Sequence, residues 1–319
     1  MDSDQPKSSV SRITTLQILV VMALWASCFP LITVGIGFAP HLTFAALRAV
    51  IAGAALMILA AALRRPLPAT GRDWITIIFI GLGATSLGFL GMFHAAEFVT
   101  PGVATVIANT QPLMAAFLAA LMLGETLSTR GKFGLLLGFI GIVVIAIPQF
   151  FSTGGETYAL GIAYILLAAF GITFSNVLIK RIAGKVDVLM AMGLQTLIGS
   201  VPLGAAAWYL EDPTTVQWTP TFLASLLGLS IFGTSLAYYL WFSALERAPL
   251  NRANAFAFLV PIFGILLGMT FFDEPFGWAH IIGIPLTIVG VMLVSRSGGS
   301  RSGDAVSFDK GRASSPSAD

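Results

Sequence analysis

One stretch of this chain occurs twice, and that duplication limits the folds open to it. A shift of 149 positions, from Thr85 to Thr234, lays residues 85–141 on residues 234–290 without a gap. The identities fall on scarce residue types as well as apolar ones: Glu97/Glu246, Pro112/Pro261, Glu125/Glu274 and Gly141/Gly290. A shared apolar bias would not align glutamate, proline and glycine. Because a repeat sets the architecture, we expect two equivalent halves.

The composition places both halves in a membrane. Of the 319 residues, 56% are hydrophobic and only 10% are charged, and the mean hydropathy is +0.89. A soluble domain of this size would lack the polar surface to cover itself. No basic stripe interleaves with aromatic residues, so no nucleic-acid partner is expected. The single cysteine, Cys28, provides neither a disulfide framework nor a metal motif. The sequence predicts an all-α integral membrane protein with no cofactor and no metal.

Ten segments are long and apolar enough to cross a bilayer, which takes about 20 mainly apolar residues. They are residues 13–35, 43–63, 74–96, 103–123, 131–149, 158–179, 188–210, 222–245, 253–272 and 278–294. The loops between them are short, and residues 296–319, rich in serine, glycine and charge, are expected to be disordered.

The charges predict an orientation. With the N-terminus in the cytoplasm, every lysine and arginine except Arg48 falls in a cytoplasmic segment. The outer loops then carry carboxylates instead: Glu97, Glu156, Glu211, Asp212, Asp273 and Glu274. A wrong number of spans would reverse the side of every later loop and scramble this division. We therefore expect a multi-pass protein of the plasma (inner) membrane with both termini in the cytoplasm.

Five spans per half give the repeat a direction. Because five is odd, the second half would cross the membrane opposite to the first, as an inverted-topology repeat. The predicted organisation is a cytoplasmic segment 1–12, a first five-helix repeat 13–150, a second five-helix repeat 151–295 and a cytoplasmic tail 296–319. Folds of this kind place a substrate site between the halves and open it alternately to each side.

This pattern resembles the EamA-type families of the drug/metabolite transporter superfamily. The resemblance covers about residues 13–295, and four features carry it: residues 25–30, Arg48, the Gly124-Glu125-Thr126 segment and the Asp273-Glu274-Pro275 segment. It implies a secondary transporter of small amphipathic metabolites. By analogy, the aromatic-rich interior looks most similar to exporters of aromatic or other hydrophobic amino acids. Transport of sugars, nucleotide sugars or drugs by the same fold stays an alternative.

Two prolines are candidate hinges. Pro112 and Pro261 lie within the fourth and ninth predicted spans, where each removes the hydrogen bond to a carbonyl four residues back. In a membrane, the freed carbonyl finds another partner most easily beside a water-filled cavity. Each proline is either a fixed kink needed for packing or a moving gate.

Polar and aromatic side chains within the spans are candidates for lining a cavity. The substrate-binding candidates are Trp25, His94, Asn109, Asn176, Tyr238, Tyr239, Trp241, Asn254 and Phe258. Buried amides can hold a zwitterion or bond helix to helix. An apolar, aromatic pocket suits a moderately hydrophobic solute, whereas core packing or an interfacial belt would use the same residue types.

Charged and titratable groups near the outer face have several possible roles. Arg48 would extend to the interface or pair with Glu97 and hold the outer helix ends together. His94 and Glu97 are three residues apart but have no further ligands nearby, so no metal site is expected. Since every Asp and Glu falls in or beside a loop, His94 is the only embedded group that titrates near neutrality. Transport is then facilitated diffusion, exchange, or a weakly proton-coupled process.

Other classes have less support. The chain contains no HExxH motif, no GxSxG motif and no paired carboxylates within a span, so an enzyme is not expected. A channel would need a ring of pore charges. The expected partners are a small-molecule substrate and the lipid bilayer. Small-residue pairs, Gly134/Gly138 and Ala279/Gly283, are expected to pack within one chain, which favours a monomer over a dimer.

Overall fold

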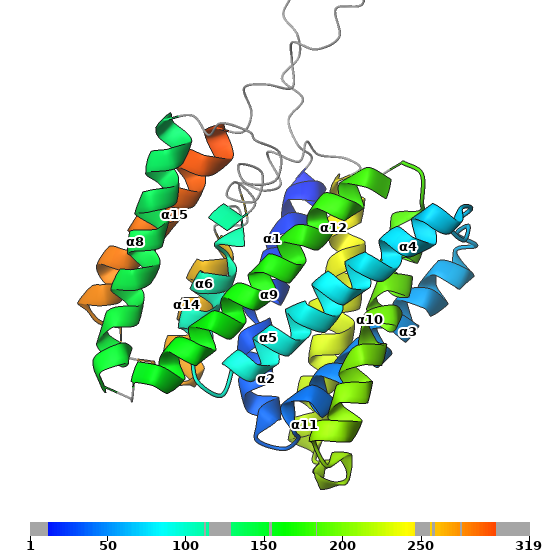
Figure 1. Cartoon of the computed structure of the whole chain (residues 1–319), viewed down its shortest axis with the longest axis horizontal. Coiled ribbons are helices and arrows are strands. Elements are labelled where there is room, and N and C mark those ends of the chain that lie inside the picture. Colours follow the sequence, from blue (N-terminus) through cyan, green and yellow to red (C-terminus); the bar gives the residue numbers. More distant parts are fainter. Residues whose placement is uncertain are drawn as a thin grey trace, which may run out of the picture.

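All regular structure in the described residues is helical. The computed structural model describes residues 12–111, 113–114, 129–152, 155–182, 184–245, 256, 259–274 and 276–297. Within these ranges the helices run side by side as a bundle, with no strand among them (Figure 1). The first predicted half contributes α1 Arg12–Ala26, α2 Cys28–Ile36, α3 His41–Ala62, α4 Gly71–Ile80, η1 Gly81–Leu87, α5 Gly88–Ala95, α6 Pro101–Ala108 and α8 Thr129–Ser152. The second contributes α9 Gly155–Ile182, α10 Val188–Leu210, η2 Pro213–Thr215, α11 Pro220–Leu227, η3 Gly228–Leu236, α12 Ala237–Leu245, α14 Leu259–Phe271 and α15 Trp278–Ser297.

Six of the described helices are long and apolar enough to cross a membrane. They are Arg12–Ile36, His41–Ala62, Gly71–Ala95, Glu156–Ile179, Val188–Leu210 and Pro220–Trp241, and two shorter apolar helices are Leu259–Phe271 and Trp278–Leu293. Each coincides within a few residues with a predicted span. The prediction of a multi-pass, all-helical membrane protein is confirmed. The count of ten stays a prediction, because much of the fourth span lies outside the described residues, as do residues 1–11 and 298–319.

Local sequence explains where several helices begin. The Thr70 hydroxyl accepts the N–H of Asp73 at 3.2 Å, and the Asp187 carboxylate accepts the N–H of Met190 at 3.0 Å. These side chains satisfy N–H groups that lack a partner in the first turn. Pro101 and Pro220 stand at the first positions of α6 and α11, where a missing N–H costs nothing. The helix starts therefore follow from local capping.

The first span is interrupted, which the sequence analysis did not anticipate. α1 ends at Ala26 and α2 begins at Cys28. Between them, the Ser27 hydroxyl donates to the carbonyl of Leu24 at 2.7 Å, a local bond that competes with the helical ladder and bends helices. The predicted continuous helix 13–35 is two pieces that share one span.

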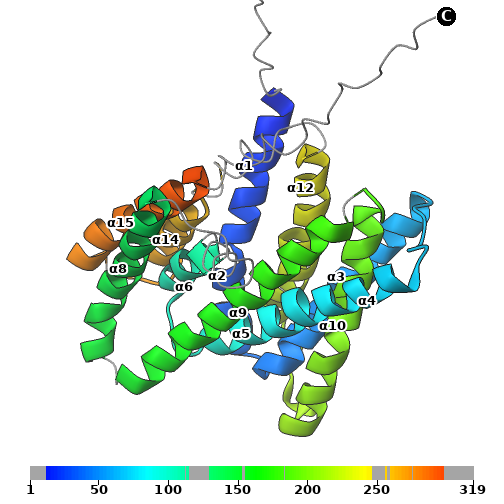
Figure 2. The same cartoon turned by 45° about the horizontal axis from the view of Figure 1, so that its top comes forward.

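Glycines join α8 to α15 at one edge of the bundle, where the two helices lie side by side in both views (Figures 1 and 2). A Cβ atom added at Gly290 would lie 2.6 Å from Cα of Gly138 and 2.7 Å from the carbonyl oxygen of Gly134. One added at Gly141 would lie 2.7 Å from the carbonyl oxygen of Gly283. No side chain fits where two backbones approach so closely. The predicted small-residue seam thus lies inside one chain.

Three helices of the first half pair with their counterparts in the second half. α3 packs along α10 at the edge opposite α8 and α15, and α6 packs on α14 between the edges (Figure 2). These contacts join the second predicted span to the seventh, the fourth to the ninth, and the fifth to the tenth. The halves are interleaved rather than adjacent.

Each half also contains a π-helical segment at the same place in the repeat. η1 ends at Leu87 and η3 ends at Leu236, so both close on the duplicated Thr-Ser-Leu tripeptide. The Ser235 hydroxyl donates to the carbonyl of Ser230 at 3.0 Å, five residues back, and the Ser86 hydroxyl makes the matching bond to Gly81 at 3.5 Å. π-Helical turns are rare and occur frequently at functional sites. This duplication directs attention to the residues that contact η1 and η3.

Candidate functional site

The π-helix of the first half is bonded to α10 of the second half. The Thr85 hydroxyl donates to Oε1 of Gln195 at 2.8 Å, and the Ser86 hydroxyl donates to the carbonyl of Gly199 at 2.8 Å. Gln195 is fully buried and also donates to Thr196 at 2.8 Å. We call this set the η1 junction. It is neutral and its amide is satisfied on both sides.

The π-helix of the second half is bonded to α3 of the first half in the same manner. The Thr234 hydroxyl accepts from Nε and Nη2 of Arg48 at 3.3 and 3.2 Å. The Ser235 hydroxyl donates to the carbonyl of Ala52 at 3.0 Å. We call this set the η3 junction. It differs from the η1 junction in carrying a full charge.

The two junctions are equivalent by position as well as by chemistry. In α3, the residues used are Arg48 and Ala52; in α10 they are Gln195 and Gly199, again four apart. The threonine and serine they meet are the first two residues of the duplicated tripeptide. Arg48 in one half therefore occupies the place of Gln195 in the other.

The surroundings of Arg48 differ from both sequence-based expectations. The residue is only 3% exposed, so it does not extend to the interface. Its guanidinium lies 4.3 Å from the centroid of the Phe89 ring, a favourable cation–π geometry, and Nη2 lies 3.8 Å from Sγ of Cys28. The expected pair with Glu97 is absent, and Nη1 has no hydrogen-bond partner.

Glu97 instead belongs to a cluster at the N-terminal end of α3. Its carboxylate pairs with Nε2 of His41 at 2.5 Å, and Nδ1 of His41 lies 3.7 Å from Glu211, the residue directly after α10. The His94 ring stacks on His41 with centroids 5.0 Å apart, and it packs at a tilt against Tyr164 at the same centroid distance. We call His41, His94, Glu97 and Glu211 the His41 cluster. It joins α3, the end of α5 and the end of α10.

Glu211 also caps α3. Its two carboxylate oxygens accept the N–H groups of Leu42 and Thr43 at 2.9 and 2.8 Å, and the Thr43 hydroxyl at 2.8 Å. A carboxylate at a helix N-terminus is favoured by the helix dipole as well as by these bonds. Because α3 belongs to the first half and Glu211 to the second, this cap fastens the halves together.

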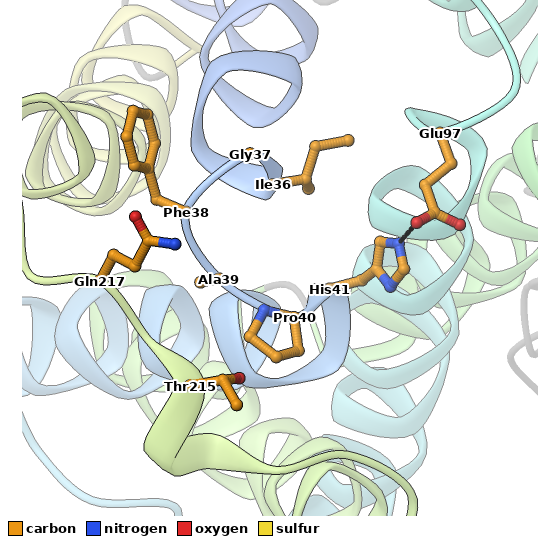
Figure 3. A pocket seen from close by; sticks show the side chains of 9 residues that line it. All are labelled: Ile36, Gly37, Phe38, Ala39, Pro40, His41, Glu97, Thr215 and Gln217. Atoms are coloured by element: carbon orange, nitrogen blue, oxygen red, sulfur yellow. Dashed lines mark ion pairs between the residues drawn. The ribbon is translucent and has the colours of Figure 1, made fainter.

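A shallow pocket of about 290 Å³ opens beside the His41 cluster. Figure 3 shows His41 and Glu97 pointing toward each other on one side of it, with Phe38 and Gln217 on the other. The backbone between α2 and α3 forms its floor. The pocket lies at a helix end rather than deep between the halves.

The aromatic candidates of the eighth predicted span, Tyr238, Tyr239 and Trp241, face different neighbours. Trp241 packs on Trp25 of α1, with ring centroids 5.2 Å apart, in an apolar cluster that includes Met22 and Val260. Tyr238 packs instead on the cluster formed by α3, α4 and α10. Tyr239, to the side, is 41% exposed. The structure brings together Trp25 and Trp241, but not all the aromatic candidates.

The amide candidates are placed unequally. Nδ2 of Asn109 donates to the carbonyl of Thr105 at 2.8 Å, within its own helix. Asn176 is exposed on α9. Asn254 and Phe258 lie outside the described residues. Two of the three amide candidates, Asn109 and Asn176, thus lie within the described residues.

The candidate hinges mark helix ends. α6 ends at Ala108, the residue whose carbonyl Pro112 could not bond, while Pro112 itself lies outside the described residues. Pro261 is buried in the first turn of α14, which begins at Leu259. In a first turn the missing proline N–H leaves no bond unmade.

Glu274, the second glutamate that the two copies share, has a defined hydrogen-bond partner. Glu274 accepts the N–H of Gly102 in the first turn of α6 at 2.8 Å. Cβ atoms at Gly102 or Gly268 would lie about 2.6 Å from its carboxylate atoms, so a side chain at either position would displace this carboxylate. Partial burial raises the pKa of Glu274 above its usual value, opposed by the bond from Gly102. Its counterpart Glu125 is outside the described residues.

Sequence reasoning missed both junctions and the His41 cluster. A signal for the junctions was present, because the Thr-Ser-Leu tripeptide opens both copies of the repeat. The predicted spans leave His41 and Glu211 in loops on the same side of the membrane, but nothing in the pattern pairs them.

The helical spans, the two equivalent halves and the polar contacts between them define a multi-pass membrane transporter of small molecules. The model of the EamA-like transporter family matches residues 12–147 and again residues 159–296. The chain therefore belongs to the EamA-like transporter family, and it is a transporter rather than an enzyme.

Individual relatives agree with this assignment. An uncharacterized transporter of Bacillus subtilis, YvbV, is 26% identical over 93% of this chain and 96% of its own length. A WAT1-related chloroplastic protein of Arabidopsis thaliana is 30% identical over 79% of this chain and 62% of its own length. Protein PecM of Dickeya dadantii is 29% identical over 73% and 77%. A solved crystal structure superimposes with a TM-score of 0.62 at 21% identity, covering 90% of this chain and 99% of the other, which shows a shared fold.

Proposed function

We propose that the protein is a secondary transporter that exports amino acids with aromatic or other hydrophobic side chains. It works by alternating access, through ten spans arranged as two inverted five-helix repeats. The observation that carries the mechanism is the pair of equivalent junctions, Thr85 with Gln195 and Thr234 with Arg48. Each fastens a π-helix of one half to a helix of the other. Two matching contacts of this kind let one half rock against the other between equivalent states.

The sidedness of polar contacts supports the inverted arrangement. Residues predicted for the outer side meet one another, as His41 meets Glu97 and as Gly102 meets Glu274. On the predicted cytoplasmic side, Arg65 lies 3.5 Å from Asp187. In this arrangement both termini are cytoplasmic, in the plasma (inner) membrane. Pro112 and Pro261 would serve as hinges in the fourth and ninth spans.

The aromatic residues support the substrate class. Trp25 and Trp241 form a tilted pair between α1 and α12, and both are only partly buried. Two indole rings in an apolar surrounding offer dispersion contacts and a quadrupole to a flat side chain. His94, Asn109, Asn176, Asn254, Tyr238, Tyr239 and Phe258 would complete the cavity in one state or another.

Counterflow into proteoliposomes tests this function. Vesicles that contain the purified full chain and are preloaded with unlabelled phenylalanine, leucine, glucose or UDP-glucose are given the same solute in labelled form. We expect transient accumulation of phenylalanine and leucine above protein-free vesicles. Accumulation of only the sugar or the nucleotide sugar would overturn the amino-acid assignment.

Trp241→Ala should impair bulky aromatic solutes more than small ones. Removing the indole takes away the surface that Trp25 and an aromatic side chain would share, so we expect phenylalanine counterflow to fall about tenfold, as for the loss of an aromatic contact of about 1.4 kcal/mol, with alanine counterflow little changed. Trp208→Ala is the matched control, because Trp208 is 74% exposed on α10. Equal losses for both solutes would mean that Trp241 only packs the core.

A further inference from the structure

The equivalence of the two junctions shows that the fold does not require a charged residue at the position of Arg48. Gln195 satisfies the same position in the other half with a neutral amide, and its donor and acceptor are both used. Arg48 presents five N–H donors to a matching site. Its contact with Thr234 uses Nε and Nη2, and Nη1 is left without a partner.

Among the described residues, Arg48 lacks a counter-ion as well as a partner for Nη1. Its described neighbours are a hydroxyl, a thiol and the rings of Phe89 and Phe93, with no carboxylate at ion-pair distance in the part of the chain that the structure describes. Because Arg48 is only 3% exposed, water does not take the place of a counter-ion. A buried charge without a partner is strongly unfavourable, and charged groups within a membrane protein mark substrate or ion pathways.

One contact of the guanidinium lies about one helical turn from the aromatic pair assigned to the substrate. Cys28, which contacts Nη2, is one helical turn beyond Trp25. A solute held against the indole pair would reach the guanidinium with a group one helical turn away.

We propose that Arg48 is the residue that binds the carboxylate of the transported solute. This inference rests on the proposed function and narrows its substrates to those bearing a carboxylate. When the halves separate at the η3 junction, Nη2 leaves Thr234 and joins the free Nη1 in a two-pronged contact with a carboxylate, the geometry that a guanidinium favours. The neutral η1 junction opens without offering such a site. Arg48 thereby makes an otherwise symmetric pair of junctions selective.

Binding to the purified full chain tests the proposal without requiring transport. Intrinsic tryptophan fluorescence is titrated with three probes: phenylalanine, phenylalaninamide, which lacks the carboxylate charge, and benzoate, which lacks the ammonium group. The variants are Arg48→Gln, which restores the residue of the equivalent junction, and Thr234→Val, which removes the partner but keeps the charge. We expect Arg48→Gln to weaken phenylalanine and benzoate at least about tenfold, the loss of a charged hydrogen bond, and to leave phenylalaninamide unchanged. Thr234→Val should not weaken either carboxylate.

Each other outcome has a defined meaning. Equal weakening of all three probes by Arg48→Gln, or equal losses in both variants, would reduce Arg48 to a structural residue and overturn the proposal. So would unchanged carboxylate binding in Arg48→Gln, or binding of neither carboxylate to the unmodified protein. If benzoate binds through Arg48 while no amino acid binds or accumulates, the anion site stands and the amino-acid function falls.

Discussion

Gly199→Leu is expected to prevent the protein from reaching its folded state. Gly199 lies where α10 crosses η1, and a Cβ atom there would meet the carbonyl oxygen of Gly81 and lie 2.5 Å from Cβ of Thr85. A Cβ at Gly81 would in turn lie 2.6 Å from the carbonyl oxygen of Gln195. The groups in the way are backbone atoms, which cannot rotate aside as a flexible side chain could. Overpacking in a core costs about 1–3 kcal/mol where side chains can yield, so the cost here exceeds that range.

The measurement is the yield and thermal stability of the membrane-extracted protein, followed by size-exclusion chromatography. Gly204→Leu is the matched control: it lies in the same helix, and a Cβ added there meets nothing within 4 Å. We expect the control to behave as the unmodified protein, and Gly199→Leu to give aggregate or a strongly lowered melting temperature. A monodisperse Gly199→Leu protein with an unchanged melting temperature would contradict the close crossing of α10 and η1.

Glu211→Ala is expected to cause the second-largest loss of folding stability. The substitution removes the acceptor for the N–H groups of Leu42 and Thr43 and for the Thr43 hydroxyl, and it deprives His41 of one of its two carboxylates. Loss of a helix cap costs about 0.5–2 kcal/mol, and hydrogen bonds to a charged group add about 1.5–3 kcal/mol. Water near the helix end replaces part of these interactions, so the full sum is not lost. We expect the free energy of unfolding to fall by about 2 kcal/mol or more.

Two variants sharpen the interpretation of this loss. Glu211→Gln keeps one acceptor oxygen and should fall between the unmodified protein and Glu211→Ala in thermal unfolding. Asp212→Ala alters the adjacent acid, whose bonds run locally to Thr214, and should leave α3 unaffected. If the neighbouring substitution destabilised the protein as much as Glu211→Ala, the cap on α3 would not be the source of the effect.

The sequence predicted the helices well because a helix in lipid is a local solution. Every backbone group in a spanning segment must be bonded within that segment, so apolar length alone locates α3, α10 and α15 within a few residues. The glycine seam could be predicted for a related reason, since small residues four apart on one face allow backbones to approach. The seam between Gly138 and Gly290 lies where those small residues indicated.

The partners of charged residues could not be predicted in this way. Arg48 and Glu97 both fall near the same predicted face, and their opposite charges suggested a pair, yet Arg48 bonds Thr234 and Glu97 bonds His41. The choice depends on how far each helix is rotated about its axis. A π-helical turn such as η3 changes that rotation by widening the helix, and no periodicity in the sequence indicated it.

By itself, then, the sequence determined that this protein is a duplicated, multi-pass helical membrane protein of the transporter class. Those properties depend on composition, length and internal similarity, which are written along the chain. Only the tertiary structure decided that the duplicated Thr-Ser-Leu tripeptides meet Gln195 in one half and Arg48 in the other. Contacts between residues 110 and 186 positions apart arise from the rotation and crossing of whole helices, and so they exist only once the bundle is assembled.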